Sequence, residues 1–287
     1  MAGRFAPSPT GPLHLGSLLA ATASYLEARK RNTPWRLRFD DLDRPRAMPG
    51  AEDAIMQGLE AHGLLWDGAV DYQSRHADAY ADALARLADL DVVFYCDCSR
   101  RQLHHFASYP GTCRARRAPR VDSAIRVNVA NQRIAFNDAV QGPQTCELED
   151  SVGDFIIRRR DGLIAYQLAT AVDDGAAEID QVVRGADLLD NTPRQLYLME
   201  LLELTPPSYA HVPVVTHEDG AKLSKQTGAA EIRAATAPHN LVTSLKLLGL
   251  TPPAEALRWR CEDILAWAQS RWSLQQVPKV RSLIGRN

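Results

Sequence analysis

Two short segments, far apart in the chain, carry residue types that suit chemistry on a nucleotide phosphate. In PSPTGPLHLGS, Gly16 lets the backbone approach a ligand, and a helix that begins near His14 would turn free N–H groups toward a phosphate. In GAKLSKQ, the ammonium groups of Lys222 and Lys225 suit the negative charge that develops on a phosphate during its transfer. Taken singly, either segment is also explained by an ordinary turn or by a lysine-rich surface loop.

A third set of reactive side chains begins at Cys96, in the pattern C-x-C-x10-Y-x3-C that ends at Cys113. Two close thiolates and a third that returns after a loop suit a structural zinc ion, which organises a segment too small to bury a core of its own. Three cysteines leave one position open, and His104 and His105 are common kinds of donor nearby. Free thiols are the alternative. The total of five Cys and the lack of a signal peptide disfavour a disulfide framework.

The same segment is rich in arginine, although the whole chain has a formal net charge of −2. Between residues 96 and 126 only Asp97 and Asp122 oppose these arginines. A local excess of positive charge favours contact with the phosphate backbone of a folded RNA, whereas the simpler interpretation is a solvated surface. The arginines are Arg100, Arg101, Arg114, Arg116, Arg117, Arg120 and Arg126.

Hydrophobic periodicity indicates the elements that must position these side chains. The order of strands and helices is βαβα, which is typical of an α/β fold with a parallel sheet covered by helices. Strand character returns in AIRVNVA and DFIIRRR, after the segment rich in arginine and cysteine. The predicted elements are a strand at 4–6, a helix at 15–31, a strand at 35–39, helices at 50–62 and 74–90, a strand ending at Tyr95 and a helix at 192–204.

Length and composition are those of an ordinary globular protein. The 287 residues are 45% hydrophobic and 24% charged, which excludes collagen-like, low-complexity and largely disordered chains. No run approaches the ~20 apolar residues of a membrane span, so we expect a cytoplasmic protein with no membrane partner. The predicted parts are 1–95 and 126–228 as two halves of one catalytic domain, 96–125 as an insertion and 229–287 as a helical appendage.

Five segments in this order resemble the catalytic core of glutamyl-tRNA synthetases: RFAPSPTGPLHLGS, RLRFDDLD, AVDD, VRGADLL and GAKLSKQ. The resemblance covers residues 4–226, with HLGS in place of the HIGH motif of class I synthetases and KLSKQ in place of KMSKS. It implies a Rossmann-like catalytic domain with a parallel sheet and a zinc-binding insertion. Too few residues follow Gly228 to form the anticodon-binding domain of the full-length enzymes.

The short length is similar to that of truncated members of this family. The resemblance therefore implies that the chain activates L-glutamate with ATP and Mg²⁺ and transfers it to the queuosine base in the anticodon loop of tRNA(Asp), acting as a monomer. One alternative is a minimal glutamyl-tRNA synthetase that charges a tRNA 3′ end. Another is a non-catalytic regulator that binds a nucleotide or an amino acid, although retained transition-state lysines argue against it.

The resemblance also implies roles for individual residues. Ser17 replaces the second histidine of HIGH, Asp40 stands where the family usually has Glu, and Thr170 stands where full-length enzymes tend to have Asn. Arg184 is the natural partner for the side-chain carboxylate of glutamate, which predicts a preference for glutamate over glutamine. The implied catalytic residues are His14, Lys222 and Lys225, and the implied nucleotide-binding residues are His14, Gly16, Ser17 and Lys225. The implied glutamate-binding residues are Arg4, Phe5, Ala6, Pro7, Ser8, Asp40, Tyr166 and Arg184, and the implied zinc ligands are Cys96, Cys98, Tyr109 and Cys113.

Overall fold

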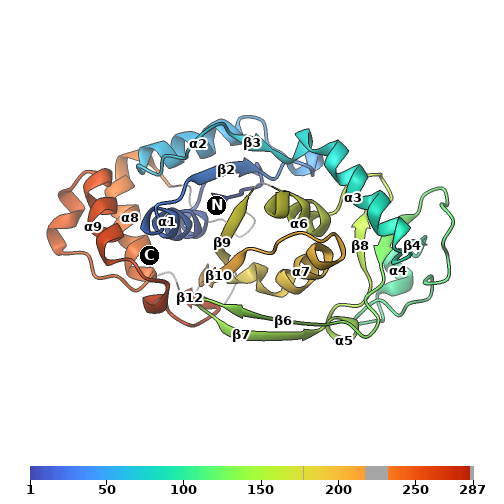
Figure 1. Cartoon of the computed structure of the whole chain (residues 1–287). Helices are drawn as coiled ribbons and strands as arrows, with labels where there is room; N and C mark the ends of the chain where they lie inside the picture. The colour runs from blue at the N-terminus through green and yellow to red at the C-terminus, as the bar shows by residue number, and fades with distance from the viewer. Residues whose placement is uncertain (177, 217–231, 285–287) are drawn as a thin grey trace.

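A seven-stranded, mainly parallel sheet forms the centre of the molecule (Figure 1). The computed structural model describes residues 1–176, 178–216 and 232–284. Strands β6 and β7 form an antiparallel hairpin at one edge and the other neighbouring strands are parallel, which confirms the predicted α/β fold. In spatial order the strands are β3 (Asp71–Tyr72), β2 (Trp35–Phe39), β1 (Ala2–Phe5), β9 (Ile179–Gly185), β10 (Ser208–Val212), β6 (Arg133–Asp138) and β7 (Gly142–Glu147).

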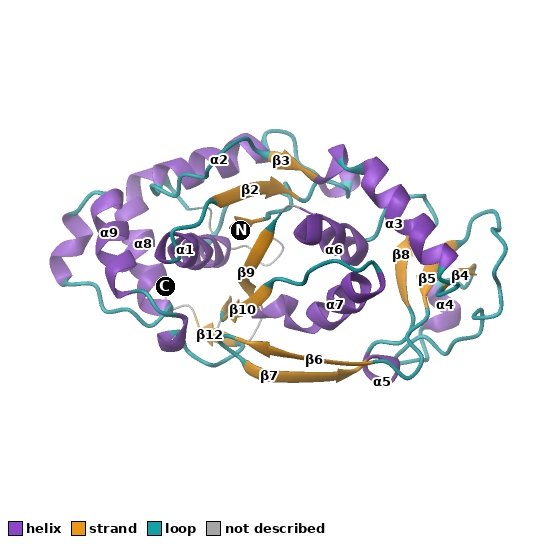
Figure 2. Cartoon of the chain, in the orientation of Figure 1, coloured by secondary structure: helices purple, strands orange, loops and turns teal. Residues whose placement is uncertain are grey.

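Helices cover both faces of this sheet, as Figure 2 shows. On one face α1 packs against β1 and β9, with α8 and α9 behind it, and these helices share a core of buried aliphatic side chains. On the other face α6 packs against α7 and α3, and a second core lies between them. The helices are α1 (Leu15–Lys30), α2 (Ala51–Ala61), α3 (Ala77–Asp89), α6 (Tyr166–Ala176), α7 (Thr192–Leu201), α8 (Ala237–Leu247) and α9 (Cys261–Arg271).

A separate three-stranded antiparallel sheet lies at the end of the molecule drawn on the right in Figure 1. The strand ending near Tyr95 belongs to it, so the prediction that this strand continues the parallel sheet is wrong. The apolar side chains of this small sheet pack on α3 and α6. The prediction failed because the periodicity of a short segment does not tell which sheet a strand joins. The strands are β4 (Val93–Cys96), β5 (Ala124–Val127) and β8 (Phe155–Arg158), and short helices α4 (Arg100–Leu103) and α5 (Leu148–Ser151) lie nearby.

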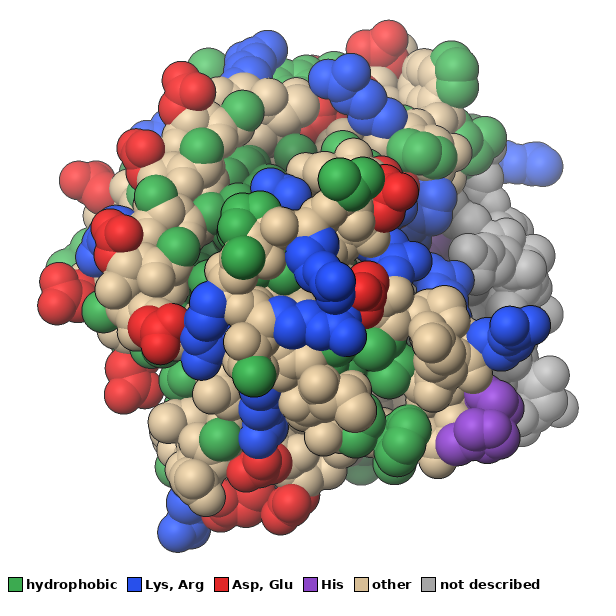
Figure 3. Space-filling view, turned by 90° about the vertical axis from the view of Figure 1, so that its right-hand side faces the viewer, with side chains coloured by type: hydrophobic (Ala, Val, Ile, Leu, Met, Phe, Trp, Pro, Cys, Tyr) green, Lys and Arg blue, Asp and Glu red, His purple; other side chains and the backbone are tan. Residues whose placement is uncertain are grey.

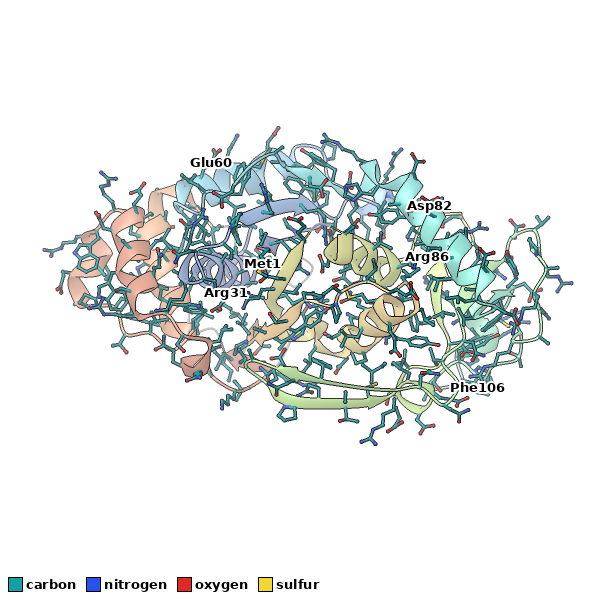
Figure 4. The ribbon with its side chains drawn as sticks, in the orientation of Figure 1. Met1, Arg31, Glu60, Asp82, Arg86 and Phe106 are labelled. Atoms are coloured by element: carbon teal, nitrogen blue, oxygen red, sulfur yellow. The ribbon has the colours of Figure 1, made fainter. Side chains whose placement is uncertain are left out.

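Two contacts join distant segments at the edges of the fold. Arg86 of α3, labelled in Figure 4, donates from Nη2 to the Leu202 carbonyl just after α7 at 2.6 Å. The C-terminal segment returns to the core, where β12 (Ser282–Ile284) pairs in parallel with β11 (Val214–Thr216). The C-terminal region therefore contains the predicted helices and also a strand that was not predicted. Within the described ranges no helix is both long and apolar enough to cross a lipid bilayer.

Candidate functional site

A cavity of about 480 Å³ lies at the carboxyl ends of β1, β2, β9 and β10, beside the start of α1. This is the edge at which open parallel sheets bind their ligands, because the loops that follow the strands meet there. Lys222 and Lys225 lie outside the described residues. All the other predicted nucleotide- and glutamate-binding residues line this one cavity: Arg4, Phe5, Ala6, Pro7, Ser8, His14, Gly16, Ser17, Asp40, Tyr166 and Arg184.

His14 forms the N-terminal cap of α1 together with Ser17. The Nδ1 atom of His14 accepts from the Ser17 backbone N–H at 3.3 Å, and the Ser17 hydroxyl accepts from the His14 N–H at 2.8 Å. Since Nδ1 accepts, the proton of the neutral imidazole is on Nε2, which can donate to a phosphate oxygen. The Ser17 hydroxyl donates its own hydrogen to the His14 carbonyl at 2.8 Å, so in this geometry it serves the cap instead of a ligand.

Arg4 and Arg38 are held beneath the cavity by two consecutive carboxylates of α6. Arg4 donates to both oxygens of Asp174, from Nε at 3.2 Å and from Nη2 at 2.9 Å, and Arg38 donates to Asp174 from Nη1 at 2.8 Å. Although burial opposes it, the two guanidinium groups hold the pKa of Asp174 well below its usual range. Asp173 accepts from Tyr80, Gln73 and His76. The AVDD segment therefore supplies the base of the site.

Asp40 is a buried carboxylate at the border of the cavity. Its side chain is 7% exposed and accepts from Arg38 Nε at 3.0 Å. Burial raises the pKa of Asp40 to about 6, against the lowering effect of the neighbouring Arg38 and Arg4. The backbone N–H of Asp40 donates to the Pro7 carbonyl at 3.0 Å, which fixes the loop after β1 against the end of β2. A carboxylate with a raised pKa at a cavity wall is suited to binding a cation or a proton.

Arg184, near the end of β9, has neutral hydrogen-bond partners. Its Nε donates to His211 Nε2 at 3.0 Å, and its Nη2 donates to Thr192 Oγ1 at 2.9 Å and to Gln195 Oε1 at 2.8 Å. The side chain is only 4% exposed, and within the described ranges it forms no ion pair and its buried Nη1 has no partner. A buried guanidinium without a carboxylate partner at a cavity wall is suited to binding an anion.

Tyr166 lies at the start of α6, where it is 36% exposed and separates two cavities. A smaller cavity of about 180 Å³ shares Ser8, Asp40 and Tyr166 with the first and continues toward Arg159 and Leu163. Thr170, one turn further along α6, is buried and does not belong to the wall of the main cavity. Thr170 therefore does not contact a ligand in the main cavity directly.

The cysteine cluster is assembled as its spacing predicts. The sulfur atoms of Cys96, Cys98 and Cys113 all lie within 4.8 Å of one another, and those of Cys98 and Cys113 are 3.6 Å apart. The Tyr109 hydroxyl accepts from the Cys113 backbone N–H at 3.0 Å, and its ring lies against Arg126. Burial raises the pKa of Cys96, but the hydrogen bond from Tyr109 and the nearby Arg126 charge outweigh it and lower that pKa.

These thiols fit a tetrahedral zinc ion. With Zn–S bonds of about 2.3 Å, sulfur ligands at tetrahedral angles are separated by about 3.8 Å, close to the 3.6 Å between the Cys98 and Cys113 sulfur atoms. His104 and His105, the alternative donors, are exposed and do not belong to the cluster in the part of the chain that is described. The neighbouring Phe106 is 52% exposed at the margin of the molecule in Figure 4. A segment with such an exposed loop has little core of its own to stabilise it.

The predicted basic surface is less positive than its sequence suggests. Figure 3 shows Lys and Arg side chains gathered on the face that contains the insertion, with acidic side chains among and beside them. Arg126 is buried, whereas Arg100 and Arg101 are exposed and form no ion pair with any described residue. Within the segment, Arg116 and Arg120 pair with Asp97. Acids from outside the segment neutralise two more arginines: Arg114 pairs with Glu149 and Asp154, and Arg117 pairs with Asp91.

Comparisons with known proteins agree with this architecture. The chain matches the sequence family described as "tRNA synthetases class I (E and Q), catalytic domain" over residues 1–260. It is 48% identical over 282 residues to a protein of Pseudomonas aeruginosa named glutamyl-Q tRNA(Asp) synthetase, across 98% of this chain and 96% of that protein. A protein of the same name from Ectopseudomonas mendocina is 48% identical over 283 residues, with the same two coverages.

Two solved structures share the fold. The glutamate-tRNA synthetase of Elizabethkingia anophelis superposes with a TM-score of 0.82 at 24% identity, and the match covers 99% of this chain and 67% of that chain. A glutamate tRNA ligase of Elizabethkingia meningosepticum gives a TM-score of 0.79 at 24% identity, with coverages of 96% and 65%. About a third of each of those chains has no counterpart in this one.

Proposed function

This chain belongs to the glutamyl-Q tRNA(Asp) synthetase family of the class I tRNA synthetases, and from that premise we propose that it activates L-glutamate with ATP and transfers the glutamyl group to the queuosine base in the anticodon loop of tRNA(Asp). In the first step an oxygen of the glutamate α-carboxylate attacks the α-phosphorus of ATP, and pyrophosphate leaves. In the second step a queuosine hydroxyl attacks the carbonyl carbon of the adenylate, AMP leaves, and the hydroxyl loses its proton.

The observation that carries the choice of glutamate is the buried Arg184 guanidinium. It lines the main cavity with neutral partners and without a carboxylate among the described residues, so the side-chain carboxylate of glutamate supplies the missing charge. A glutamine amide offers one neutral acceptor oxygen in place of two charged ones, and its N–H donors find no acceptor in a guanidinium, which consists only of donors. Asp40 lines the same cavity, together with Ser8 and Tyr166, and its carboxylate is proposed to accept the α-ammonium group of the amino acid.

The nucleotide belongs at the start of α1. The N-terminal N–H groups of this helix and the Nε2–H of His14 present donors to phosphate oxygens, and Gly16 permits close approach of the backbone. Lys222 and Lys225, outside the described residues, are proposed to neutralise the leaving pyrophosphate. Mg²⁺ bound with ATP would supply positive charge that offsets the negative charge of the phosphates. None of these steps requires a side-chain nucleophile.

The smaller cavity is proposed as the entry of the acceptor hydroxyl. It shares Ser8, Asp40 and Tyr166 with the main cavity, and Arg46 and Arg159 also line it. Zinc bound by Cys96, Cys98, Cys113 and Tyr109 would hold the insertion in shape. The exposed Arg100 and Arg101 on that insertion are suited to contact an RNA backbone.

The deciding experiment is transfer of labelled glutamate, with ATP and Mg²⁺, to three acceptors: tRNA(Asp) with queuosine, tRNA(Asp) without it, and tRNA(Glu). We expect label only on the tRNA that carries queuosine. Label on tRNA(Glu) that is lost when its 3′ end is oxidised would instead identify a minimal charging enzyme. Glutamate-dependent pyrophosphate exchange is measured in parallel, since a binding protein without catalysis shows none.

A further inference from the structure

Three buried side chains are joined by hydrogen bonds at the wall of the amino-acid cavity, and two of them, Asp138 and His211, have no role in the function proposed above. Asp138 of β6, His211 of β10 and Arg184 of β9 are 1%, 0% and 4% exposed. The His211 Nδ1 lies 2.6 Å from Asp138 Oδ2, and its Nε2 lies 3.0 Å from Arg184 Nε. The three residues come from neighbouring strands of the central sheet, so the sheet itself holds them in line.

The hydrogen-bond geometry determines where the imidazole proton is. Arg184 Nε–H is always a donor, so His211 Nε2 must be an acceptor and the proton must be on Nδ1, directed at Asp138. Complete burial also lowers the pKa of His211, which keeps the ring neutral with a single proton. The hydrogen bonds therefore link a carboxylate to a neutral imidazole, and that imidazole to a guanidinium.

We infer that His211 and Asp138 are positioning residues that make Arg184 selective for a substrate carboxylate. The inference rests on the proposed function, because it concerns how the amino acid is recognised. A neutral imidazole fixes the guanidinium plane without cancelling its charge, whereas a carboxylate in direct contact would cancel it. Asp138 does not contact Arg184 and acts through His211. It accepts a hydrogen bond from Nδ1–H of His211, so Nε2 carries no hydrogen and can accept from Arg184.

The surroundings of Asp138 allow a clean test of this proton arrangement. Its Oδ1 accepts three backbone N–H groups, from Val140 at 3.0 Å, Gln141 at 2.8 Å and His211 at 3.1 Å. In an Asp138→Asn variant these three donors hold the amide oxygen in the Oδ1 position, so the amide NH₂ must face His211 Nδ1. The imidazole proton then moves to Nε2, where it faces the Arg184 N–H, so Arg184 Nε loses its acceptor while Nη2 keeps Thr192 and Gln195.

The experiment measures glutamate-dependent pyrophosphate exchange in the full chain. In D138N we expect the KM for glutamate to rise on the order of 10- to 100-fold, as for a lost hydrogen bond to a charged group, while kcat changes less than about threefold. The ratio of kcat/KM for glutamate to that for glutamine should fall as well. Asp180→Asn, the same chemical change on β9 outside the cavity, is the matched control and should leave both constants unchanged.

A double-mutant cycle separates positioning from simple packing. Glutamine at position 211 in a His211→Gln variant carries an oxygen that can accept from Arg184 whichever group is at position 138. Adding D138N to H211Q should therefore raise the KM for glutamate by less than about threefold further. If D138N instead raises this KM equally in the unmodified chain and in H211Q, the inference is overturned.

If D138N does not fold, nitrogen NMR of labelled histidine in the unmodified chain tests the inference. A proton found on Nε2 of His211 would contradict it. Absence of any exchange in the unmodified chain would instead contradict the proposed function.

Discussion

Arg4 and Asp174, 170 positions apart in the sequence, form a two-point ion pair that joins β1 to α6 beneath the cavity. Both side chains are almost completely buried, and the Arg4 fork donates two of its hydrogens to the two oxygens of this one carboxylate. Arg4 also lines the main cavity, where the resemblance implies that it contacts glutamate. The pair fixes the first strand of the sheet against the helix that carries Tyr166, and it leaves Arg184 as the guanidinium without a carboxylate partner among the described cavity residues.

The first prediction concerns the stability that this pair provides. Asp174→Asn leaves Arg4 and Arg38 buried without their shared carboxylate, so we expect a loss of about 3–5 kcal/mol in the free energy of unfolding by urea. Asp190→Asn, which breaks an exposed pair with Arg281, should change it little. Because the pKa of Asp174 is lowered in the folded state, its contribution is complete at neutral pH and is lost only as the pH falls below the ordinary value for Asp. Equal changes in the free energy of unfolding for the two variants would show that the buried pair contributes no more stability than the exposed one.

The second prediction concerns amino-acid choice at Arg184. Arg184→Gln removes the charge but retains a polar side chain, so kcat/KM for glutamate in pyrophosphate exchange should fall on the order of 100-fold or more. The relative rate with glutamine should rise, since an amide can pair with an amide. Far-ultraviolet circular dichroism would check that the fold is intact. Undiminished preference for glutamate in this variant would rule out Arg184 as the group that recognises the side-chain carboxylate.

The third prediction is a pH dependence at Asp40, whose pKa is raised to about 6. The ionised carboxylate is the form that holds an ammonium group, so kcat/KM for glutamate should decline about tenfold per pH unit below about 6. In Asp40→Asn the overall activity should be lower and this acidic decline should be absent. A decline of the same shape in the variant would assign it to a group other than Asp40.

The raised pKa of Asp40 also bears on folding. Between the ordinary pKa of Asp and about 6, the folded chain binds a proton that the unfolded chain has released. This group therefore makes the protein less stable as the pH rises through that interval. Thermal unfolding of Asp40→Asn should thus show a gain in stability at pH 7 that disappears below about pH 4. Such a gain would mean that the ionised Asp40 carboxylate in the cavity lowers the stability of the fold at neutral pH.

The fourth prediction is one zinc ion per chain, held at the cysteine cluster. Elemental analysis of the purified protein should find zinc, and Cys98→Ser should lose most of it, because a hydroxyl is a poor substitute for a thiolate ligand. Cys146→Ser, outside the cluster, should retain it. Tyr109→Phe tests the fourth ligand: we expect weaker retention of zinc during dialysis against a chelator. Protein that contains no zinc when prepared without chelator would refute the metal site.

The fifth prediction separates the two steps of the proposed reaction. Leu163→Trp should fill the smaller cavity while leaving the main one open, so pyrophosphate exchange should stay within about twofold and transfer to tRNA should fall at least about tenfold. Ala135→Trp, which places the same side chain at an exposed position of β6, is the control. Equal loss of both activities would show that the smaller cavity is not a separate entry for the acceptor.

Local sequence was sufficient for the elements that carry the site. The predicted helix at 15–31 and strand at 35–39 agree closely with α1 and β2, because both have a clear period and α1 begins at a capping pair within three residues. The cysteine spacing likewise brought three sulfur atoms together, since they lie within one short segment. The central strand β9 was not predicted as an element, because IDQVVRG combines polar and apolar residues without a simple period.

By itself, the sequence determined which chemical groups are present and in what order the motifs occur, and from these the family and the cavity residues follow. Only the tertiary structure decided what each buried charge pairs with. The Arg4 guanidinium is bound by Asp174, the predicted basic surface is partly neutralised by Asp91, Glu149 and Asp154, and Arg184 is oriented by His211 and Asp138. The reason is physical: side-chain period depends on near neighbours, whereas the partner of a buried charge comes from whichever distant strand or helix packs against it.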